Sequence, residues 1–358
     1  MVPIFKPFMP EGIMPEIEKI LYSGNLAFGP YGKLFEQQLS EFIGNDKTMT
    51  VSSYNHAMMI VLSALALEPG DEVIASPVSC LASNQPFAIK KLKIVWADVN
   101  PRTGSIDPED IKKRITSKTK AIFHNHFCGF LGEIDAVNAI AKEHGLLVID
   151  DCIEAFGSEY NGKQIGNISS DVKVFSFQTV RLPNTIDGAA VTFKNQALFE
   201  KAKKIRDYGI DRTKFRDSFG EISSDCDIAL EGYGATMGEV NSYIGLEQMK
   251  VIKILLNKQR DNAKAWEEKF HDYKGVKPVI LNSGTNPNYW VYGILCKNKM
   301  ETLLDIRSKG FYATGVHINN NIYSVFNNKE NLKGVNEFMN SFLAVPCGWW
   351  MDGTEIKF

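Results

Sequence analysis

Residues 172–193 combine two apolar runs with a loop between them that carries one cation, Arg181. The β-branched and aromatic residues of each run predict buried strands, so the loop is held at both ends. A guanidinium stays protonated to above about pH 12 and offers only hydrogen bonds, whereas a buried lysine can lose its proton and attack a carbonyl. Arg181 therefore indicates ion pairing and excludes a Schiff base formed at this position.

An acidic motif at residues 148–157 is the second candidate for chemistry. Asp151 ends an apolar run, and burial of a carboxylate is costly unless a charged group pairs with it. Two interpretations stay open. Asp151 either binds a cationic ligand or forms a structural salt bridge, with Arg181 as the conceivable partner.

Two further side chains lie where ligands commonly bind. His126 follows the apolar run 121–124, and the carboxyl ends of parallel strands are the usual ligand sites of open α/β sheets. A catalytic histidine and a structural one are both open there. Cys80 lies in the turn 76–84, and a buried thiol without a role is the plainer interpretation.

The elements that must position these groups follow an alternating pattern. Apolar runs alternate with helical segments between residues 72 and 151, which predicts a mainly parallel sheet with helices on both faces. A short strand at 50–53 leads into a helix at about 55–67. The helix N-terminus, at Ser53, Tyr54 and Asn55, favours an anion, although Asn55 as a simple N-cap is the plain alternative.

Residues 196–231 show no chemical motif. The pattern at 196–208 predicts an amphipathic helix, and residues 212–230 predict a polar surface excursion. On the solvated side of the helix we expect cations without a function, namely Lys201, Lys203, Lys204 and Arg206.

These motifs resemble those of the DegT/DnrJ/EryC1/StrS sugar aminotransferase family, which uses pyridoxal phosphate. The family loop has Ser-Phe, three residues, Lys, and then Gly-Glu-Gly-Gly. This chain has Ser176-Phe177, then Arg181, and Ile-Asp-Gly-Ala at residues 186–189. The resemblance spans nearly the whole chain.

The resemblance implies an α/β fold. Its large domain, residues 1–250, would contain a mainly parallel seven-stranded sheet flanked by helices, as in aspartate aminotransferase. Residues 251–358 would form a small α+β C-terminal domain. The likeness also implies a homodimer, because relatives build the site between two chains.

Residue roles follow from the same likeness. Cofactor contacts map onto Ser53, Tyr54, Asn55, Cys80, Asp151, Glu154 and Ser176. Catalytic candidates are Arg181 at the lysine position, His126, and His317, which lies in the turn matching the substrate-facing His-Tyr of relatives. Asp151 would hold the protonated pyridine nitrogen.

Several of these positions depart from the family pattern. Tyr54-Asn55 replace a Gly-Thr pair, Cys80 replaces a ring-stacking aromatic residue, and Gly234 replaces an asparagine that reaches the phosphate across the dimer. Glu154 replaces Gln or His, and its charge would repel the cofactor phenolate unless the carboxyl were protonated. Together the changes indicate a remodelled or emptied pocket.

Three hypotheses follow. The first is an enzyme on the aminotransferase fold that acts on or binds a nucleotide-linked sugar, or a related polar metabolite, in surface-polysaccharide biosynthesis, where transamination would need a group other than lysine to move the proton. The second is a non-catalytic homologue, a binding or regulatory subunit that has lost pyridoxal phosphate. The third is an engineered Arg181, which the other departures disfavour.

Composition supports an ordinary globular protein. The 358 residues carry 40 basic and 42 acidic side chains, a balance that argues against nucleic acid or an anionic membrane as partner. The six cysteines show no metal-ligand spacing, so we expect no metal site and a reducing compartment, the cytoplasm. No apolar run approaches the roughly 18 residues of a membrane span.

Overall fold

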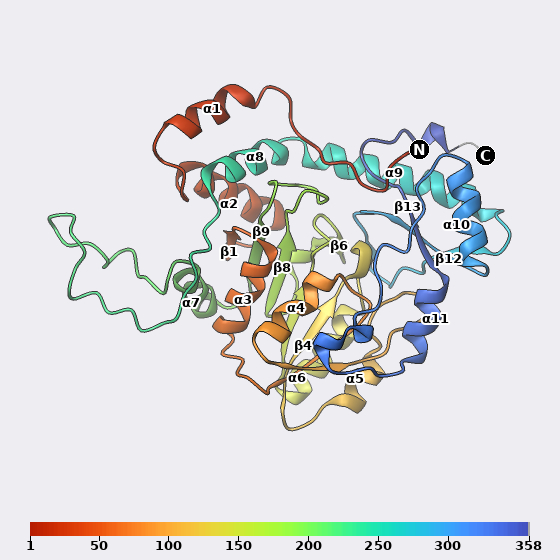
Figure 1. Cartoon of the computed structure of the whole chain (residues 1–358), viewed down its shortest axis with the longest axis horizontal. Coiled ribbons are helices and arrows are strands. Elements are labelled where there is room, and N and C mark those ends of the chain that lie inside the picture. Colours follow the sequence, from red (N-terminus) through yellow and green to blue (C-terminus); the bar gives the residue numbers. More distant parts are fainter. Residues whose placement is uncertain (357–358) are drawn as a thin grey trace.

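A seven-stranded sheet forms the centre of the molecule in the computed structural model, which describes residues 1–356 (Figure 1). Along the sheet the strands lie in the order β1 (Thr48–Val51), β9 (Ala189–Phe193), β8 (Val172–Ser176), β5 (Leu147–Asp151), β4 (Thr119–Asn125), β2 (Glu72–Ala75) and β3 (Lys93–Trp96). β9 runs antiparallel to both neighbours, and the remaining pairs are parallel. The prediction of a mainly parallel seven-stranded sheet is confirmed.

Helices cover both faces of this sheet. One face packs against α3 (Tyr54–Ala64), α4 (Leu81–Ile89) and α7 (Gln196–Arg206). The other packs against α2 (Pro30–Ile43), α5 (Pro108–Arg114), α6 (Ile134–His144) and α8 (Glu239–Met249). Because strand side chains alternate, Ile149 and Asp151 face α3 whereas Val148 and Asp150 face α6.

The C-terminal part has a core of its own around Trp266 and Ile294. Its elements are α9 (Ile252–His271), β10 (Val276–Pro278), β12 (Tyr292–Cys296), α10 (Lys299–Ser308), α11 (Lys333–Ser341) and β13 (Phe342–Val345). β10, β12 and β13 form an antiparallel sheet. The α+β character is as expected, and the boundary at residue 250, which stays a prediction, coincides with the break between α8 and α9.

Short elements complete the chain. They are α1 (Met14–Tyr22), the small sheet of β11 (Thr285–Asn286), β6 (Glu159–Tyr160) and β7 (Lys163–Gln164), and the 3-10 turns η1 (Phe127–Gly129), η2 (Ile165–Asn167), η3 (Asn320–Ile322), η4 (Ser324–Phe326) and η5 (Gly353–Glu355). No helix among the described residues is long and apolar enough to cross a bilayer.

The N-terminal segment 2–8 runs across both parts of the molecule. The Val2 amide donates to the Gly310 carbonyl at 2.6 Å, and the ring of Phe5 stacks on Trp290 with centroids 4.3 Å apart. Further along, the Phe8 carbonyl accepts hydrogen bonds from the side chains of Asn184 and Gln248. The segment therefore ties the C-terminal part to the loop that follows β8.

Two local expectations were wrong. The N-cap of α3 is Ser53, whose hydroxyl accepts from the His56 amide at 3.2 Å, and Asn55 already lies inside the helix. On α7, Arg206 is only 7% exposed because its guanidinium pairs with Glu36. The excursion after α7 is exposed as predicted, and it extends well away from the body of the molecule (Figure 1).

Candidate functional site

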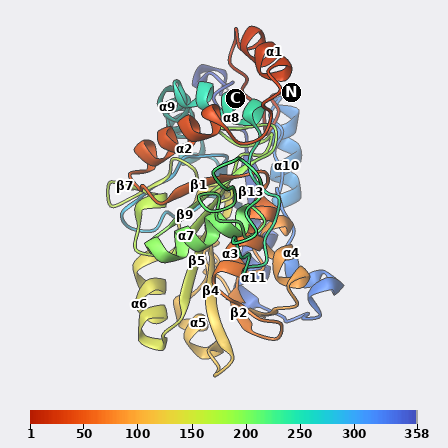
Figure 2. The same ribbon diagram turned by 90° about the vertical axis from the view of Figure 1, so that its left-hand side faces the viewer.

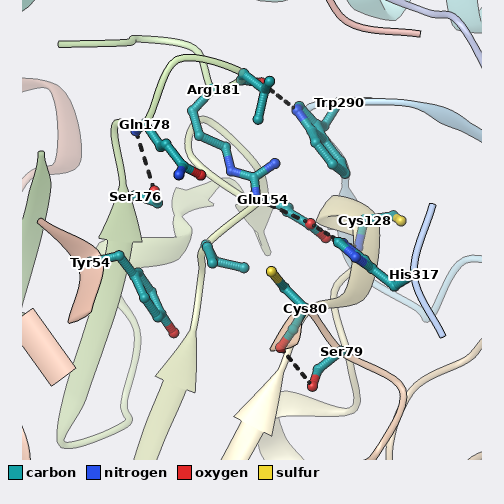
Figure 3. A network of polar contacts seen from close by, with 12 residues as sticks. Tyr54, Ser79, Cys80, Cys128, Glu154, Ser176, Gln178, Arg181, Trp290 and His317 are labelled. Atoms are coloured by element: carbon teal, nitrogen blue, oxygen red, sulfur yellow. Dashed lines mark hydrogen bonds and ion pairs between the residues drawn. The ribbon is translucent and has the colours of Figure 1, made fainter. Parts of the chain in front are cut away.

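The candidate site lies at the carboxyl ends of β5 and β8, beside the N-terminus of α3. The sheet alternation places Asp151 and Ser176 on the α3 face, and Tyr54 is the first residue of α3. Figure 3 shows Glu154 between the guanidinium of Arg181 and the ring of His317, with the thiol of Cys80 pointing toward them and Tyr54 to one side. The structure thus brings together residues from five separate parts of the chain, since His317 approaches from the far side.

Asp151 is fully buried and is held by donors from its own chain. The Tyr54 hydroxyl donates to Oδ1 at 2.7 Å and the Asn125 side-chain amide donates to Oδ2 at 2.5 Å. The backbone amide of Ile153 also donates to Oδ1, at 3.2 Å. Burial raises the pKa of Asp151 against the opposing effect of its hydrogen bonds, and it raises the pKa of Tyr54 well above 10. The interpretation of Asp151 as the salt-bridge partner of Arg181 is wrong.

Arg181 pairs instead with Glu154. Its Nη2 lies 3.3 Å from Glu154 Oε1, and the guanidinium lies over the Trp290 ring at 4.3 Å. His317 Nε2 contacts the same carboxylate oxygen at 2.8 Å, and the Cys128 amide donates to Oε2 at 2.7 Å. Burial pushes the pKa of Glu154 up, but His317 and Arg181 outweigh it, so the pKa lies below its usual value.

This pairing leaves hydrogen-bonding capacity on Arg181. Arg181 as a whole residue is 6% exposed, and neither Nε nor Nη1 finds an acceptor among the described residues. A buried donor without an acceptor costs free energy of about 1–3 kcal/mol. These two nitrogens, Nε and Nη1, therefore favour a ligand that supplies oxygen acceptors.

The remaining residues that were predicted to contact the cofactor make few side-chain hydrogen bonds in the structure. Ser176 Oγ accepts from the Gln178 amide at 3.3 Å, and Asn55 is exposed at the start of α3. Cys80 is at the N-cap position of α4, where its side chain makes no capping hydrogen bond, and it is half-buried; burial raises the pKa of its thiol to about 11. Cys80 is therefore protonated at neutral pH and is a poor nucleophile.

His126 lies outside this group of residues. It is fully buried, its Nε2 lies 3.3 Å from Asp150 Oδ1, and its Nδ1 accepts from the Gly132 amide. His124 Nδ1 lies 3.0 Å from the same carboxylate oxygen. Asp150 and His124 are on the α6 face of the sheet, so the structure does not bring His126 to Arg181 and His317.

The trio of His124, His126 and Asp150 offers three metal-ligand atoms within 4.8 Å of one another. Direct imidazole–carboxylate contacts account for that proximity. Burial lowers the pKa of His126, which keeps its imidazole neutral, while the two imidazoles outweigh burial and lower the pKa of Asp150.

Sequence reasoning missed two residues of the site. Asn125 could have been found, because adjacent parallel strands place it directly beside Asp151. Nothing in the sequence indicates that Trp290 belongs to the site. It lies far from Arg181 along the chain, just before β12, and only the folded structure brings the two together. Its indole Nε1 donates to the Val180 carbonyl at 2.9 Å and so fixes the loop that carries Arg181.

Comparison with known proteins supports a common ancestry over nearly the whole chain. The model of the DegT/DnrJ/EryC1/StrS aminotransferase family matches residues 8–357. The uncharacterized protein MJ1066 of Methanocaldococcus jannaschii is 30% identical over 294 residues, 82% of this chain and 76% of that protein. The spore coat polysaccharide biosynthesis protein SpsC of Bacillus subtilis is 27% identical over 284 residues, 79% of this chain and 73% of SpsC.

Solved structures agree with this match. The sugar aminotransferase CalS13 from Micromonospora echinospora superposes with a TM-score of 0.92 at 25% identity, covering 99% of this chain and 98% of that one. PseC of Helicobacter pylori, an aminotransferase involved in pseudoaminic acid biosynthesis, gives 0.87 at 25% identity, covering 98% and 94%.

Proposed function

The chain belongs to the DegT/DnrJ/EryC1/StrS aminotransferase family, and from this premise we propose that it binds a nucleotide-linked sugar in surface-polysaccharide biosynthesis without lysine-dependent transamination. The sugar substrate class is supported by the family and by relatives such as SpsC and PseC, whose names place them in polysaccharide and pseudoaminic acid biosynthesis. The absence of transamination is a property that we infer from the pocket of this chain.

The observation that carries the proposal is the ion pair of Arg181 with Glu154. Arg181 follows Ser176-Phe177 at the spacing at which relatives carry the lysine that forms the Schiff base. A guanidinium cannot form that bond, and here it is already paired with a buried carboxylate at 3.3 Å. The pairing supports a stable binding role for the loop.

The residues of the pocket do not fit pyridoxal phosphate. Asp151 already accepts hydrogen bonds from Tyr54, Ile153 and Asn125, and burial raises its pKa, so it is a poor partner for a pyridinium N–H. Cys80 offers no aromatic face, and the lowered pKa of Glu154 keeps a negative charge where the family expects a neutral side chain near the phenolate. We therefore propose no step that uses the cofactor.

The same residues suit a polar, hydroxyl-rich ligand. Arg181 offers two unpaired donor nitrogens, Nε and Nη1, while the carboxylate of Glu154 and the imidazole of His317 are acceptor and donor for hydroxyl groups. Trp290 lies against Arg181 and holds it in place. In this proposal the residues of the site bind and orient a sugar ring, and the charged groups Arg181 and Glu154 keep their charges when the sugar binds.

The family also supports a homodimer. Exposed apolar side chains on the excursion after α7 are consistent with a second copy as partner, among them Tyr208, Phe219, Ile222 and Ile228. The six thiols, all free in the structure, support the cytoplasm as location.

An absorbance titration with pyridoxal phosphate tests the proposal. We expect no visible band of the kind that an enzyme-bound Schiff base gives, and no added mass after borohydride reduction and intact mass spectrometry. Calorimetry with nucleotide-linked sugars should show saturable binding that Arg181→Ala weakens. A reducible lysine adduct, or transfer of an amino group to a sugar, would contradict the proposal.

A further inference from the structure

His317 is the accessible member of the charged group in the candidate site. Its side chain is 19% exposed, against 5% for Arg181 and 1% for Glu154. The segment that carries it, between α10 and α11, lies beside α4 on the face of the sheet that α3 covers (Figure 2). Asn320 anchors this segment, because its side-chain amide donates to the Ser79 carbonyl at 3.0 Å. A molecule that approaches from solvent therefore meets His317 first.

The contact with Glu154 orients the imidazole of His317. Nε2 lies 2.8 Å from Glu154 Oε1, and Nδ1 has no hydrogen-bond partner among residues 1–356. The pKa of Glu154 lies below its usual value, because His317 and Arg181 outweigh burial, so the carboxylate can only accept a hydrogen bond. We therefore assign the hydrogen of the neutral imidazole to Nε2, which leaves the lone pair on Nδ1. The Phe127 ring packs edge-on against the imidazole, with centroids 5.9 Å apart, and so restricts its rotation.

Two non-glycine residues that hold this pair have a left-handed backbone. Val316, directly before His317, has a φ of 59°, and Cys128 has a φ of 55°. The Cys128 amide donates to Glu154 Oε2 at 2.7 Å. A positive φ is uncommon outside glycine, and for a β-branched residue such as valine it is an outlier. Strained backbone of this kind clusters at functional sites, so its presence on both sides of the pair favours a function over a purely structural contact.

Arg181 adds a fixed positive charge beside the imidazole. Its Nη2 and the Nε2 of His317 contact the same oxygen of Glu154, so the guanidinium and the imidazole flank one carboxylate (Figure 3). Nε and Nη1 of Arg181 are buried and have no acceptor among the described residues. Buried donors that are already in place stabilise negative charge as it develops on a substrate oxygen. The site therefore combines a proton acceptor with a group that stabilises an oxyanion.

We propose that the site isomerises a keto sugar, with His317 as the general base and Arg181 as the partner of the carbonyl oxygen. A base beside an oxyanion-stabilising cation suits removal of a proton from a carbon next to a carbonyl group. Glu154 is the positioning residue, because it fixes the ring of His317 and stabilises the imidazolium that forms. The inference rests on the proposed function, which supplies the sugar, and it adds a reaction that the proposed binding does not require.

The reaction conserves all atoms and electrons. Nδ1 of His317 takes the proton from the hydroxyl-bearing carbon next to the carbonyl group. The electron pair of that C–H bond forms the double bond of an enediolate, and the carbonyl oxygen takes the negative charge beside Arg181. The imidazolium then returns the proton to the former carbonyl carbon, while the hydroxyl proton passes to the former carbonyl oxygen and a new carbonyl group forms. The carbonyl group has moved by one carbon, and the step consumes no oxidant or reductant.

Proton NMR of the full-length protein in D₂O, without added pyridoxal phosphate, tests this reaction. The probes are UDP- and dTDP-linked 4-keto-6-deoxyhexoses, whose C3 carries both a hydrogen and a hydroxyl group. We expect at least one probe to lose its C3 hydrogen about 100-fold faster than in buffer and to form the isomer with a shifted carbonyl group. His317→Ala should remove this acceleration while calorimetry still detects binding of the same probe. Added imidazole should restore part of the rate, and His271→Ala, which changes an exposed histidine on α9, should leave the rate unchanged.

Three results would overturn the inference. One is that the wild type binds a probe but exchanges its C3 hydrogen no faster than buffer, which would leave the proposed function standing. Another is that His317→Ala exchanges the hydrogen as fast as the wild type. The third is that His317→Ala loses activity, is not rescued by imidazole and has an altered circular dichroism spectrum, which would give His317 a structural role. If no nucleotide-linked sugar binds at all, the proposed function fails together with the inference.

Discussion

Replacement of Arg181 by alanine should destabilise the protein strongly, because it leaves the Glu154 carboxylate without its cation. Glu154 is 2% exposed, so water cannot replace the lost partner. We therefore predict that Arg181→Ala lowers the free energy of unfolding far more than loss of a surface arginine would. Arg212→Ala is the matched control, because Arg212 pairs with Asp207 at a side chain that is 56% exposed.

The magnitude follows from the contacts. Breaking a buried ion pair from one side costs about 3–5 kcal/mol, and loss of the stacking on Trp290 adds roughly 1 kcal/mol. His317 and the Cys128 amide still hold Glu154, which moves the expectation to the lower end, about 3 kcal/mol. The exposed pair of Arg212 should contribute less than about 1 kcal/mol.

A double-mutant cycle in urea, followed by circular dichroism, measures the pair itself. Glu154→Gln in the Arg181→Ala background removes the orphaned charge, so we expect a coupling energy of about 1.5–3 kcal/mol. The depressed pKa of Glu154 adds a pH signature. Its contribution is present above the unfolded pKa, near 4.5, and is lost as the pH falls through the folded value.

The Arg181→Ala penalty should therefore shrink in acid. Two results would refute the reasoning: a penalty for Arg181→Ala no larger than that for Arg212→Ala, or a coupling energy below about 0.5 kcal/mol.

Three more predictions concern positions around the sheet and the site. Tyr54→Phe removes a donor from a buried carboxylate and should cost about 1–3 kcal/mol in urea unfolding, and no measurable loss would contradict the 2.7 Å hydrogen bond. Burial lowers the pKa of Lys173 to about 8, so above that pH the unfolded state binds more protons than the folded state. Relative to Lys173→Met, the free energy of unfolding of the wild type should therefore rise by roughly 2 kcal/mol between about pH 7.5 and about pH 10. Gly129→Ala should lower the melting temperature more than Gly310→Ala. Both glycines have positive φ, but a Cβ at residue 129 would clash with Asn288 Oδ1, whereas the space beside residue 310 is open. Equal melting temperatures of the two variants would rule out that clash.

The architecture could be predicted from the sequence because it depends on local patterns. Alternating apolar runs and helices between residues 72 and 151 are enough to indicate a parallel sheet. The central loop could be placed for the same reason, since strands on both sides fix its ends. Element boundaries were less certain, and the start of α3 shows why. Ser53 and Asn55 are both good N-caps, and only the hydrogen bond to His56 decides between them.

The pairing of charges could not be predicted in the same way. Asp151 and Glu154 are three residues apart and equally acidic, so the sequence gives no reason for Arg181 to choose one of them. In the structure the Tyr54 hydroxyl donates a hydrogen bond to Asp151, and His317, from the C-terminal part, contacts Glu154 beside Arg181. Arg206 was misplaced because a helical pattern shows which face is polar and cannot show that Glu36 and Thr50 cover part of that face.

The path of the N-terminal segment bears on how the chain folds during synthesis. Val2 pairs with residues 310–312 and Phe5 stacks on Trp290, and both are translated long before these partners. Such contacts between distant parts of a chain form slowly, because a long loop must close first. The indole of Trp290, which fixes the loop that carries Arg181, is therefore synthesised late. Until then Phe5 and the loop after β8 lack the residue that they contact in the folded protein. We expect the central sheet to form first and the candidate pocket to be among the last regions to order.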